Sequence, residues 1–329
     1  MAEWLYEDGI GEQRAALVAD GDIIAARIVW DSDGPRAGAV IPGRLAERHA
    51  GGRRGLVRFE DGGEALLEPI PPGVAEGAAL RVEIIREAIP EAGRPKPARA
   101  RFTEEPARAA PTLLEEIRAS GLPVRPLLPH QPDALEAAGW SELLAEAMTG
   151  EIPFPGGALR LSPTPAMALF DVDGGLPPAD LARAGAMAAA RAITRLDIGG
   201  SIGIDLPTVA NKAERQAVAE IIDAILPRPF ERTGVNGFGF LQIVRRRARA
   251  SLPERLRADP AGAAARALLR RAERTPGAGE RMLVAAPQVI AAIAPEWVEQ
   301  LAARLGAPIA LRAEPGRPIS DAHVQPAHP

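Results

Sequence analysis

The sequence predicts an α+β protein of several domains. The chain has 329 residues, and because roughly 100–200 residues make one domain, we expect two or three domains. Short alternating apolar and polar runs, separated by Gly-rich turns, fill the first 105 residues. From about residue 140, apolar strands alternate with amphipathic helices instead, which is typical of a mixed sheet with helical crossovers.

The first 105 residues read as strands joined by tight turns. Residues 14–30 predict two strands around the turn Asp20–Gly21. Five further strands are expected at residues 38–42, 55–59, 64–68, 80–87 and 98–102. So many short strands over about 70 residues favour a small barrel or sandwich.

Residues 106–149 are rich in proline and charge. They predict a connector with short helices that packs on a domain without building one. Residues 150–262 predict the mixed sheet, with strands at 158–161, 166–172, 201–206 and 237–244 and helices at 181–196 and 212–226. Residues 263–329 predict a small α/β unit whose last dozen residues are loose.

The composition excludes several chemistries. The chain lacks cysteine, which rules out disulfides, thiolate zinc sites, iron–sulfur clusters and cysteine nucleophiles. Its four histidines never lie four residues apart, so no zincin-type helix is present. The net charge of −4 does not indicate a general affinity for nucleic acid. The acidic N-terminal segment lacks an apolar core, so we expect a cytoplasmic protein without a membrane span.

Two predicted strands each end in aspartate. The first carries Asp171 and Asp173, the second carries Asp205, and a helix of crossover length lies between them. If the strands are parallel neighbours, Asp171 and Asp205 lie roughly 5 Å apart at the carboxyl edge of the sheet. Such carboxylates repel one another unless a cation joins them, and Mg²⁺ prefers oxygen ligands. The alternative is that each aspartate caps the turn or helix that follows it.

Two basic features suggest phosphate or RNA contacts. Arg245 and Arg247 belong to a short arginine run that could grip phosphates bidentately, although a solvated basic helix start has the same pattern. On the predicted barrel, Phe59 could stack on a base beside Lys96. Packing of Phe59 in the barrel core is the alternative.

At this point the sequence resembles the bacterial ribonuclease E/G family. Three ordered motifs carry the resemblance: GGALRLSPTPAMALFDVD at 156–173, RLDIGGSIGID at 195–205 and FGFLQIVRRR at 238–247. The resemblance implies an OB-type RNA-binding barrel within residues 1–105, a deoxyribonuclease-I-like nuclease subdomain at 150–262 and a small C-terminal domain.

The resemblance also implies roles for individual residues. Asp171 and Asp205 fall on the family's two catalytic aspartates, which hold Mg²⁺, and Asp173 falls on an asparagine of the same site. Phe59 and Lys96 fall near an aromatic residue and a lysine that contact RNA. The family's cysteine zinc link is absent, so no zinc is expected and dimerisation through zinc is excluded. The short connector implies that the sensor for 5′-monophosphates is largely missing.

Two functions therefore stand side by side. One is a Mg²⁺-dependent endoribonuclease that hydrolyses single-stranded RNA with a metal-activated water. The other is a family paralogue that binds RNA without cutting it, because Pro165, Leu206 and Gln242 stand where the family motifs have other residues. A scaffold subunit that contacts protein through its barrel is a third, weaker hypothesis.

Overall fold

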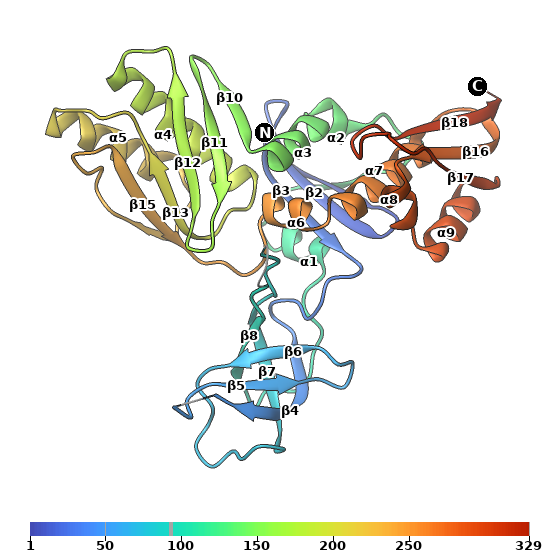
Figure 1. The fold of residues 1–329 in the computed structure, drawn as a ribbon, viewed down its shortest axis with the longest axis horizontal. Helices are drawn as coiled ribbons and strands as arrows, with labels where there is room; N and C mark the ends of the chain where they lie inside the picture. The colour runs from blue at the N-terminus through green and yellow to red at the C-terminus, as the bar shows by residue number, and fades with distance from the viewer. Residues whose placement is uncertain (50, 92–94, 329) are drawn as a thin grey trace.

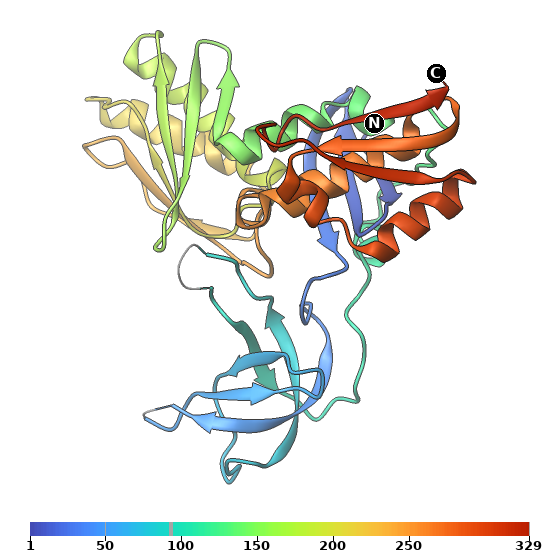
Figure 2. The same cartoon turned by 45° about the vertical axis from the view of Figure 1, so that its right-hand side comes forward.

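Within residues 1–49, 51–91 and 95–328, which the computed structural model describes, the strands form a four-stranded sheet, a closed barrel, a six-stranded sheet and a three-stranded sheet. The barrel extends from the other three sheets (Figures 1 and 2). The chain is therefore an α+β multidomain protein, as predicted. No helix in the described part of the chain is both long enough and apolar enough to span a membrane.

The first sheet has the strand order β3-β2-β1-β9. Its strands are β1 (Glu3–Asp8), β2 (Glu12–Ala19), β3 (Asp22–Trp30) and β9 (Val124–Pro126). The predicted turn at Asp20–Gly21 joins β2 to β3, and both residues have positive φ, as a tight hairpin turn requires. The fourth strand pairs parallel with β1, and helix α1 (Leu113–Arg118) packs its buried Leu113 and Ile117 against Trp4 and Tyr6.

Two segments that are far apart in the chain build this sheet. The N-terminal strands β1, β2 and β3 form a sheet separate from the barrel, and β9 completes it. The segment 106–149 supplies this fourth strand and the helix α1 that packs on the sheet. It also contains α2 (Ala134–Ala137) and α3 (Trp140–Thr149).

The five strands predicted between residues 38 and 102 close into a barrel in the order β4-β5-β6-β8-β7. They are β4 (Val40–Arg48), β5 (Gly55–Arg58), β6 (Glu64–Leu67), β7 (Ala79–Arg86) and β8 (Ala98–Phe102). Closure comes from the parallel pairing of β6 with β8. Small aliphatic side chains such as Val57, Ala65 and Val82 fill the interior, because alternate residues of each strand point inward.

The six-stranded sheet has the order β10-β11-β12-β13-β15-β14. Its strands are β10 (Glu151–Phe154), β11 (Gly157–Pro163), β12 (Ala168–Gly174), β13 (Gly200–Asp205), β14 (Phe230–Arg232) and β15 (Phe240–Arg245). The crossover from β12 to β13 is α4 (Pro178–Arg195), and α5 (Lys212–Ile225) follows β13. Both helices pack on one face of the sheet, where apolar strand residues meet their alanine- and isoleucine-rich sides.

The C-terminal unit builds the last sheet, of order β17-β16-β18. Helix α6 (Leu252–Ala258) leads into this unit, and its buried leucines belong to the core shared by the first and six-stranded sheets. The elements of the unit are α7 (Pro260–Arg274), β16 (Ala278–Ala285), α8 (Pro287–Ala291), α9 (Pro295–Leu305), β17 (Ile309–Ala313) and β18 (His323–His328). The prediction that the last dozen residues are loose is wrong for residues 323–328, which pair antiparallel with β16. This pairing satisfies backbone groups that a free tail would leave to water.

A buried ionic network joins the first sheet to α7. The Glu7 carboxylate on β1 accepts hydrogen bonds from Arg14 at 2.8 Å, Arg270 at 3.1 Å and Arg274 at 2.7 Å. Arg14 has no exposed surface and also contacts Glu12, and Asp133 provides a further acid for Arg270. Three arginines thus face three carboxylates, which is how buried charges are normally tolerated.

Candidate active site

The strand-end aspartates are neighbours on adjacent strands. The predicted parallel pairing of β12 with β13 is present, and its register places Asp171 directly beside Asp205. Parallel neighbours lie about 5 Å apart in the hydrogen-bonding direction. The arrowhead of β12 in Figure 1 points to this edge, on the side of the sheet away from the barrel.

Both carboxylates belong to the sheet face that the helices leave open. Phe170 and Ile204 are fully buried in the core under the helices, and side chains alternate along a strand. Asp171 and Asp205 therefore point to the opposite face, and Asp173, two residues further along β12, shares it. Asp205 and Asp173 are exposed and Asp171 is half-buried, so water reaches all three.

The donor set suits a hard cation. Carboxylate oxygens open to water are what Mg²⁺ uses when it keeps part of its hydration shell. In the described residues there is no cluster of three or more His, Cys, Asp or Glu side chains arranged to hold a metal. The residues that could hold an ion are the neighbouring Asp171 and Asp205, with Asp173 on the same face, and water would complete the coordination shell.

A cation of the protein itself lies beside this pair. Arg160 on β11 is in register with Asp171 and forms an exposed ion pair with Glu151 at 3.2 Å. The hydrogen bond from Arg160 to Glu151 raises the pKa of Arg160, and the charges of Asp173 and Asp171 act in the same direction. Repulsion among the carboxylates is thus partly offset without a metal, which weakens that part of the sequence argument.

Arg160 is a site residue that the motifs do not single out, although the sequence carries a signal for it. Leu159 and Leu161 flank Arg160 and are both buried in the core. Strand alternation in this short run therefore places Arg160 on the polar face. The local pattern does not reveal the antiparallel register that sets Arg160 opposite Asp171.

The structure does not bring Arg245 and Arg247 to the aspartates. Because β15 runs antiparallel to β13, Asp205 pairs with Phe240 whereas Arg245 pairs with Gly200 at the other end of β13. Five residues of strand separate the two ends, or roughly 17 Å. Arg245 donates to the Ile198 carbonyl at 3.2 Å, and burial lowers the pKa of its guanidinium.

Most of the other arginines in this segment make contacts within the protein, whereas Arg246 is exposed. Arg247 is ion-paired with Glu254, Arg249 contacts Glu116 at 2.7 Å, and Arg255 contacts Asp33 at 2.5 Å. These pairs connect the six-stranded sheet and α6 to the first sheet and α1. The run therefore serves mainly to hold the units together.

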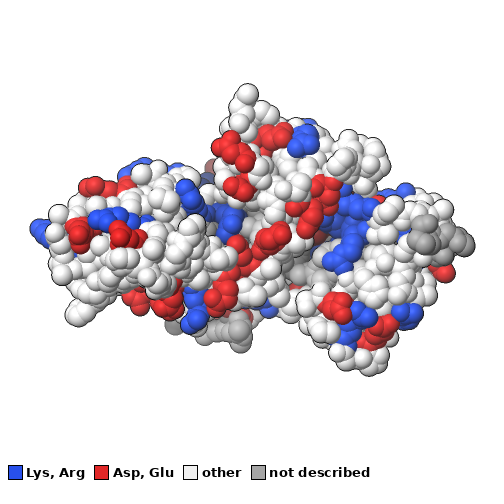
Figure 3. Space-filling view, turned by 90° about the horizontal axis from the view of Figure 1, so that it is seen from above, with Lys and Arg blue, Asp and Glu red and all other residues white. Residues whose placement is uncertain are grey.

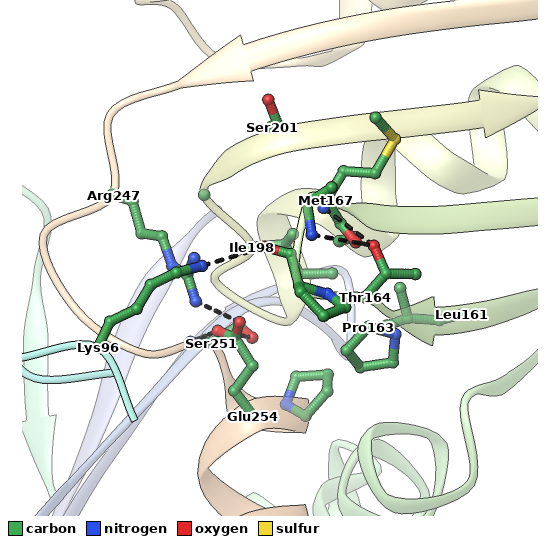
Figure 4. A pocket seen from close by; sticks show the side chains of 15 residues that line it. Lys96, Leu161, Pro163, Thr164, Met167, Ile198, Ser201, Arg247, Ser251 and Glu254 are labelled. Carbon is green, nitrogen blue, oxygen red and sulfur yellow. Dashed lines mark hydrogen bonds and ion pairs between the residues drawn. The ribbon is translucent and has the colours of Figure 1, made fainter. Parts of the chain in front are cut away.

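The two barrel residues predicted to contact RNA, Phe59 and Lys96, both make contacts within the protein. The Phe59 ring is 5% exposed and belongs to the barrel core, at the base of a hollow of about 540 Å³ that Arg44 and Arg58 also line. Lys96 is ion-paired with Glu91 and donates to the Pro165 carbonyl at 3.3 Å. Figure 4 shows Lys96 directed into the pocket between the barrel and the six-stranded sheet, beside Arg247 and Glu254.

Charged side chains of both signs lie on the face seen from above. Figure 3 shows Asp and Glu in a band across the middle of this face, with Lys and Arg in separate patches beside it.

In comparisons with known proteins, no family and no curated protein matches the sequence.

Proposed function

We propose that the protein is a Mg²⁺-dependent endoribonuclease of the ribonuclease E/G type that hydrolyses phosphodiesters of single-stranded RNA at the edge formed by Asp171 and Asp205. The observation that carries the proposal is the parallel register that sets these two carboxylates side by side on an open, water-accessible face. The three sequence motifs also support it, since the motif at 156–173 contains Asp171 and the motif at 195–205 ends on Asp205.

In this proposal Asp171 and Asp205 hold the cation and Asp173 assists through its exposed carboxylate. A bound Mg²⁺ supplies an activated water and offsets negative charge on the phosphate that is attacked. Arg160 is placed to receive a phosphate oxygen next to the cation, because its exposed guanidinium adjoins Asp171 on the same face. On the same proposal, the barrel is of the OB type and the six-stranded sheet with α4 and α5 is the deoxyribonuclease-I-like subdomain.

The second candidate is an RNA-binding protein without catalysis. Its specific support is Arg160, which gives the aspartates a cationic neighbour that does not depend on a metal. Gln242 lies on β15 and stands in place of a motif glutamate. The loss of that carboxylate also favours this second candidate. This candidate predicts RNA binding that is indifferent to Mg²⁺ and to loss of the two carboxylates.

The test is cleavage of a labelled single-stranded RNA oligonucleotide in Mg²⁺ and in EDTA. The variant Asp171→Asn with Asp205→Asn removes both proposed ligands with little change in shape. Asp22→Asn with Asp31→Asn is the matched control, because it removes the same charge from two exposed residues, one at the start of β3 and one directly after its end. Calorimetric titration with Mg²⁺ alone gives a readout that does not depend on turnover.

We expect Mg²⁺-dependent cleavage by the parent and control proteins, with loss of cleavage and of Mg²⁺ binding in the double Asn variant at the site. Equal cleavage in EDTA, or unchanged cleavage by that variant, overturns the proposed mechanism. Tight RNA binding without turnover in any protein selects the second candidate.

A further inference from the structure

The aromatic ring of Phe238 is almost fully exposed next to the aspartate edge. Its exposed fraction is 85%, whereas the next most exposed aromatic ring in the described part of the chain, Phe102, is at 38%. Phenylalanine is normally buried, since exposure forfeits the free energy of removing its ring from water. A single ring left in water beside a candidate active site therefore needs an explanation.

The turn that carries Phe238 is held by hydrogen bonds. The Asn236 side-chain oxygen accepts from the Phe238 amide at 2.9 Å and from the Phe240 amide at 3.0 Å. Thr208 donates its hydroxyl to the Phe238 carbonyl at 3.4 Å. These contacts fix the backbone on both sides of the ring, so the ring projects from a defined position.

The same turn presses against the chain just beyond Asp205. The Leu206 amide donates to the Gly239 carbonyl at 3.2 Å. Gly239 has φ +94°, and a Cβ there would lie 2.1 Å from the Leu206 carbonyl oxygen, so only glycine fits. The ring of Phe238 is thereby tied to the strand end that presents the Asp205 carboxylate.

A comparison with Phe240 separates the two neighbouring rings. Phe240 pairs with Asp205 on the open face, and a Cβ on Gly203 would come within 2.7 Å of its ring. Phe240 thus lies against the sheet and is half-buried, which is a packing role. The ring of Phe238 does not pack against the sheet in this way, so its faces are free to contact a ligand.

We propose that Phe238 is a stacking platform that holds a base of single-stranded RNA next to the phosphate located at Asp171 and Asp205. This inference rests on the proposed function and adds the residue that positions the substrate. A base presents an apolar, polarisable face that stacks on an aromatic ring whatever its sequence. One isolated ring is far smaller than the several-hundred-Å² patch of a protein interface.

The test uses fluorescence anisotropy in Mg²⁺ with a labelled single-stranded RNA oligonucleotide whose linkages resist hydrolysis, so that binding is measured without cleavage while the cation proposed to hold the phosphate is present. Phe238→Ala removes the ring, and Phe238→Trp keeps a stacking surface. Val244→Ala is the control, because Val244 is 49% exposed on β15 and its truncation also removes exposed apolar surface, but no aromatic ring. Oligonucleotides with one abasic position, moved along the strand, locate the stacked base.

We expect Phe238→Ala to weaken RNA binding about 5- to 100-fold, whereas Phe238→Trp and Val244→Ala stay within about twofold of the parent. One abasic position should weaken binding by the parent and have no further effect on Phe238→Ala. Equal affinities for the parent and Phe238→Ala, or an abasic profile that Phe238→Ala leaves unchanged, overturn the inference. Cleavage assays on the same proteins judge the proposed nuclease separately, because the binding readout needs no turnover.

Discussion

The substitution Glu7→Gln tests how the C-terminal unit is held on the first sheet. Glu7 is 2% exposed and its carboxylate is shared by Arg14, Arg270 and Arg274. Glutamine keeps the size of the side chain but removes its charge, and its amide group turns a donor toward these donors. The variant therefore leaves three buried or nearly buried guanidinium groups with one carboxylate fewer.

The expected loss of stability is large. Removing one partner of a buried ion pair costs about 3–5 kcal/mol, since the other charge stays buried without compensation. Asp133 is the remaining acid near Arg270 and Arg274, and its side chain is 24% exposed. Because this side of the network reaches water, the arginines can be partly solvated there. We therefore expect a loss of unfolding free energy at the lower end of the range, about 3 kcal/mol.

The control lies on the same strand. Glu3 pairs with Arg125 at 3.0 Å, and the side chains are 38% and 51% exposed. Because exposed ion pairs contribute little, Glu3→Gln should change the free energy of unfolding by less than about 1 kcal/mol. The two substitutions are chemically identical, so their difference isolates burial of the network.

The assay is urea unfolding followed by tryptophan fluorescence, since Trp4 and Trp30 are buried within the first sheet. With m near 1–3 kcal/mol/M, a loss of about 3 kcal/mol lowers the midpoint by about 1–3 M. Burial alone would raise the pKa of Glu7, but Arg14 and the neighbouring arginines hold it below the ordinary 4.5. The stabilisation is therefore present above pH 4.5 and is lost as the pH falls through the folded-state pKa.

The gap between Glu7→Gln and the parent protein should accordingly shrink in acid. A Glu7→Gln protein as stable as Glu3→Gln at pH 7 would refute the reasoning. A gap that stays constant from pH 7 down through acid would show that the charge of Glu7 does not produce it.

Three further predictions follow from other parts of the structure. Arg160→Gln should tighten Mg²⁺ binding about two- to tenfold in calorimetry, because it removes a positive charge next to the aspartates; unchanged or weaker binding contradicts the proposed site. Burial raises the pKa of Glu87, so the protein loses stability as the pH rises above the unfolded-state value. Glu87→Gln should then raise the melting temperature at pH 7.5 but not at pH 4, and a uniform effect contradicts this. Gly11→Ala places a Cβ 2.6 Å from the Trp297 ring and should destabilise by about 1–3 kcal/mol more than Gly21→Ala, which meets no neighbour within 4 Å.

Local patterns predicted most of the elements. Alternation and Gly-rich turns predicted the five barrel strands, and the helix between two apolar strands predicted the parallel pair β12 and β13 with its crossover α4. That helix has the length that brings a chain back to the same edge of a sheet. The placement of Asp171 beside Asp205 could therefore be predicted before any coordinates were known.

Local patterns did not predict which strands pair when the partners lie far apart in the chain. The three-residue strand β9 pairs with β1 from more than 100 residues away, and β18 adds itself to β16 at the end of the chain. Short edge strands have weak patterns of their own, because their stability comes from the sheet that they join. For this reason the local pattern predicts a connector and a loose tail in place of β9 and β18.

The sequence by itself determined the kind of chemistry available to this protein: carboxylates at strand ends, no thiols, and arginine in place of nearly all lysine. Only the tertiary structure decided which of these groups meet. The antiparallel course of β15 carries Arg245 to the far edge of the sheet and brings Phe240 to Asp205. Closure of the barrel buries Phe59, and a turn that Asn236 organises leaves Phe238 in water. Strand direction and closure depend on contacts between distant segments, so spacing along the chain does not reveal them.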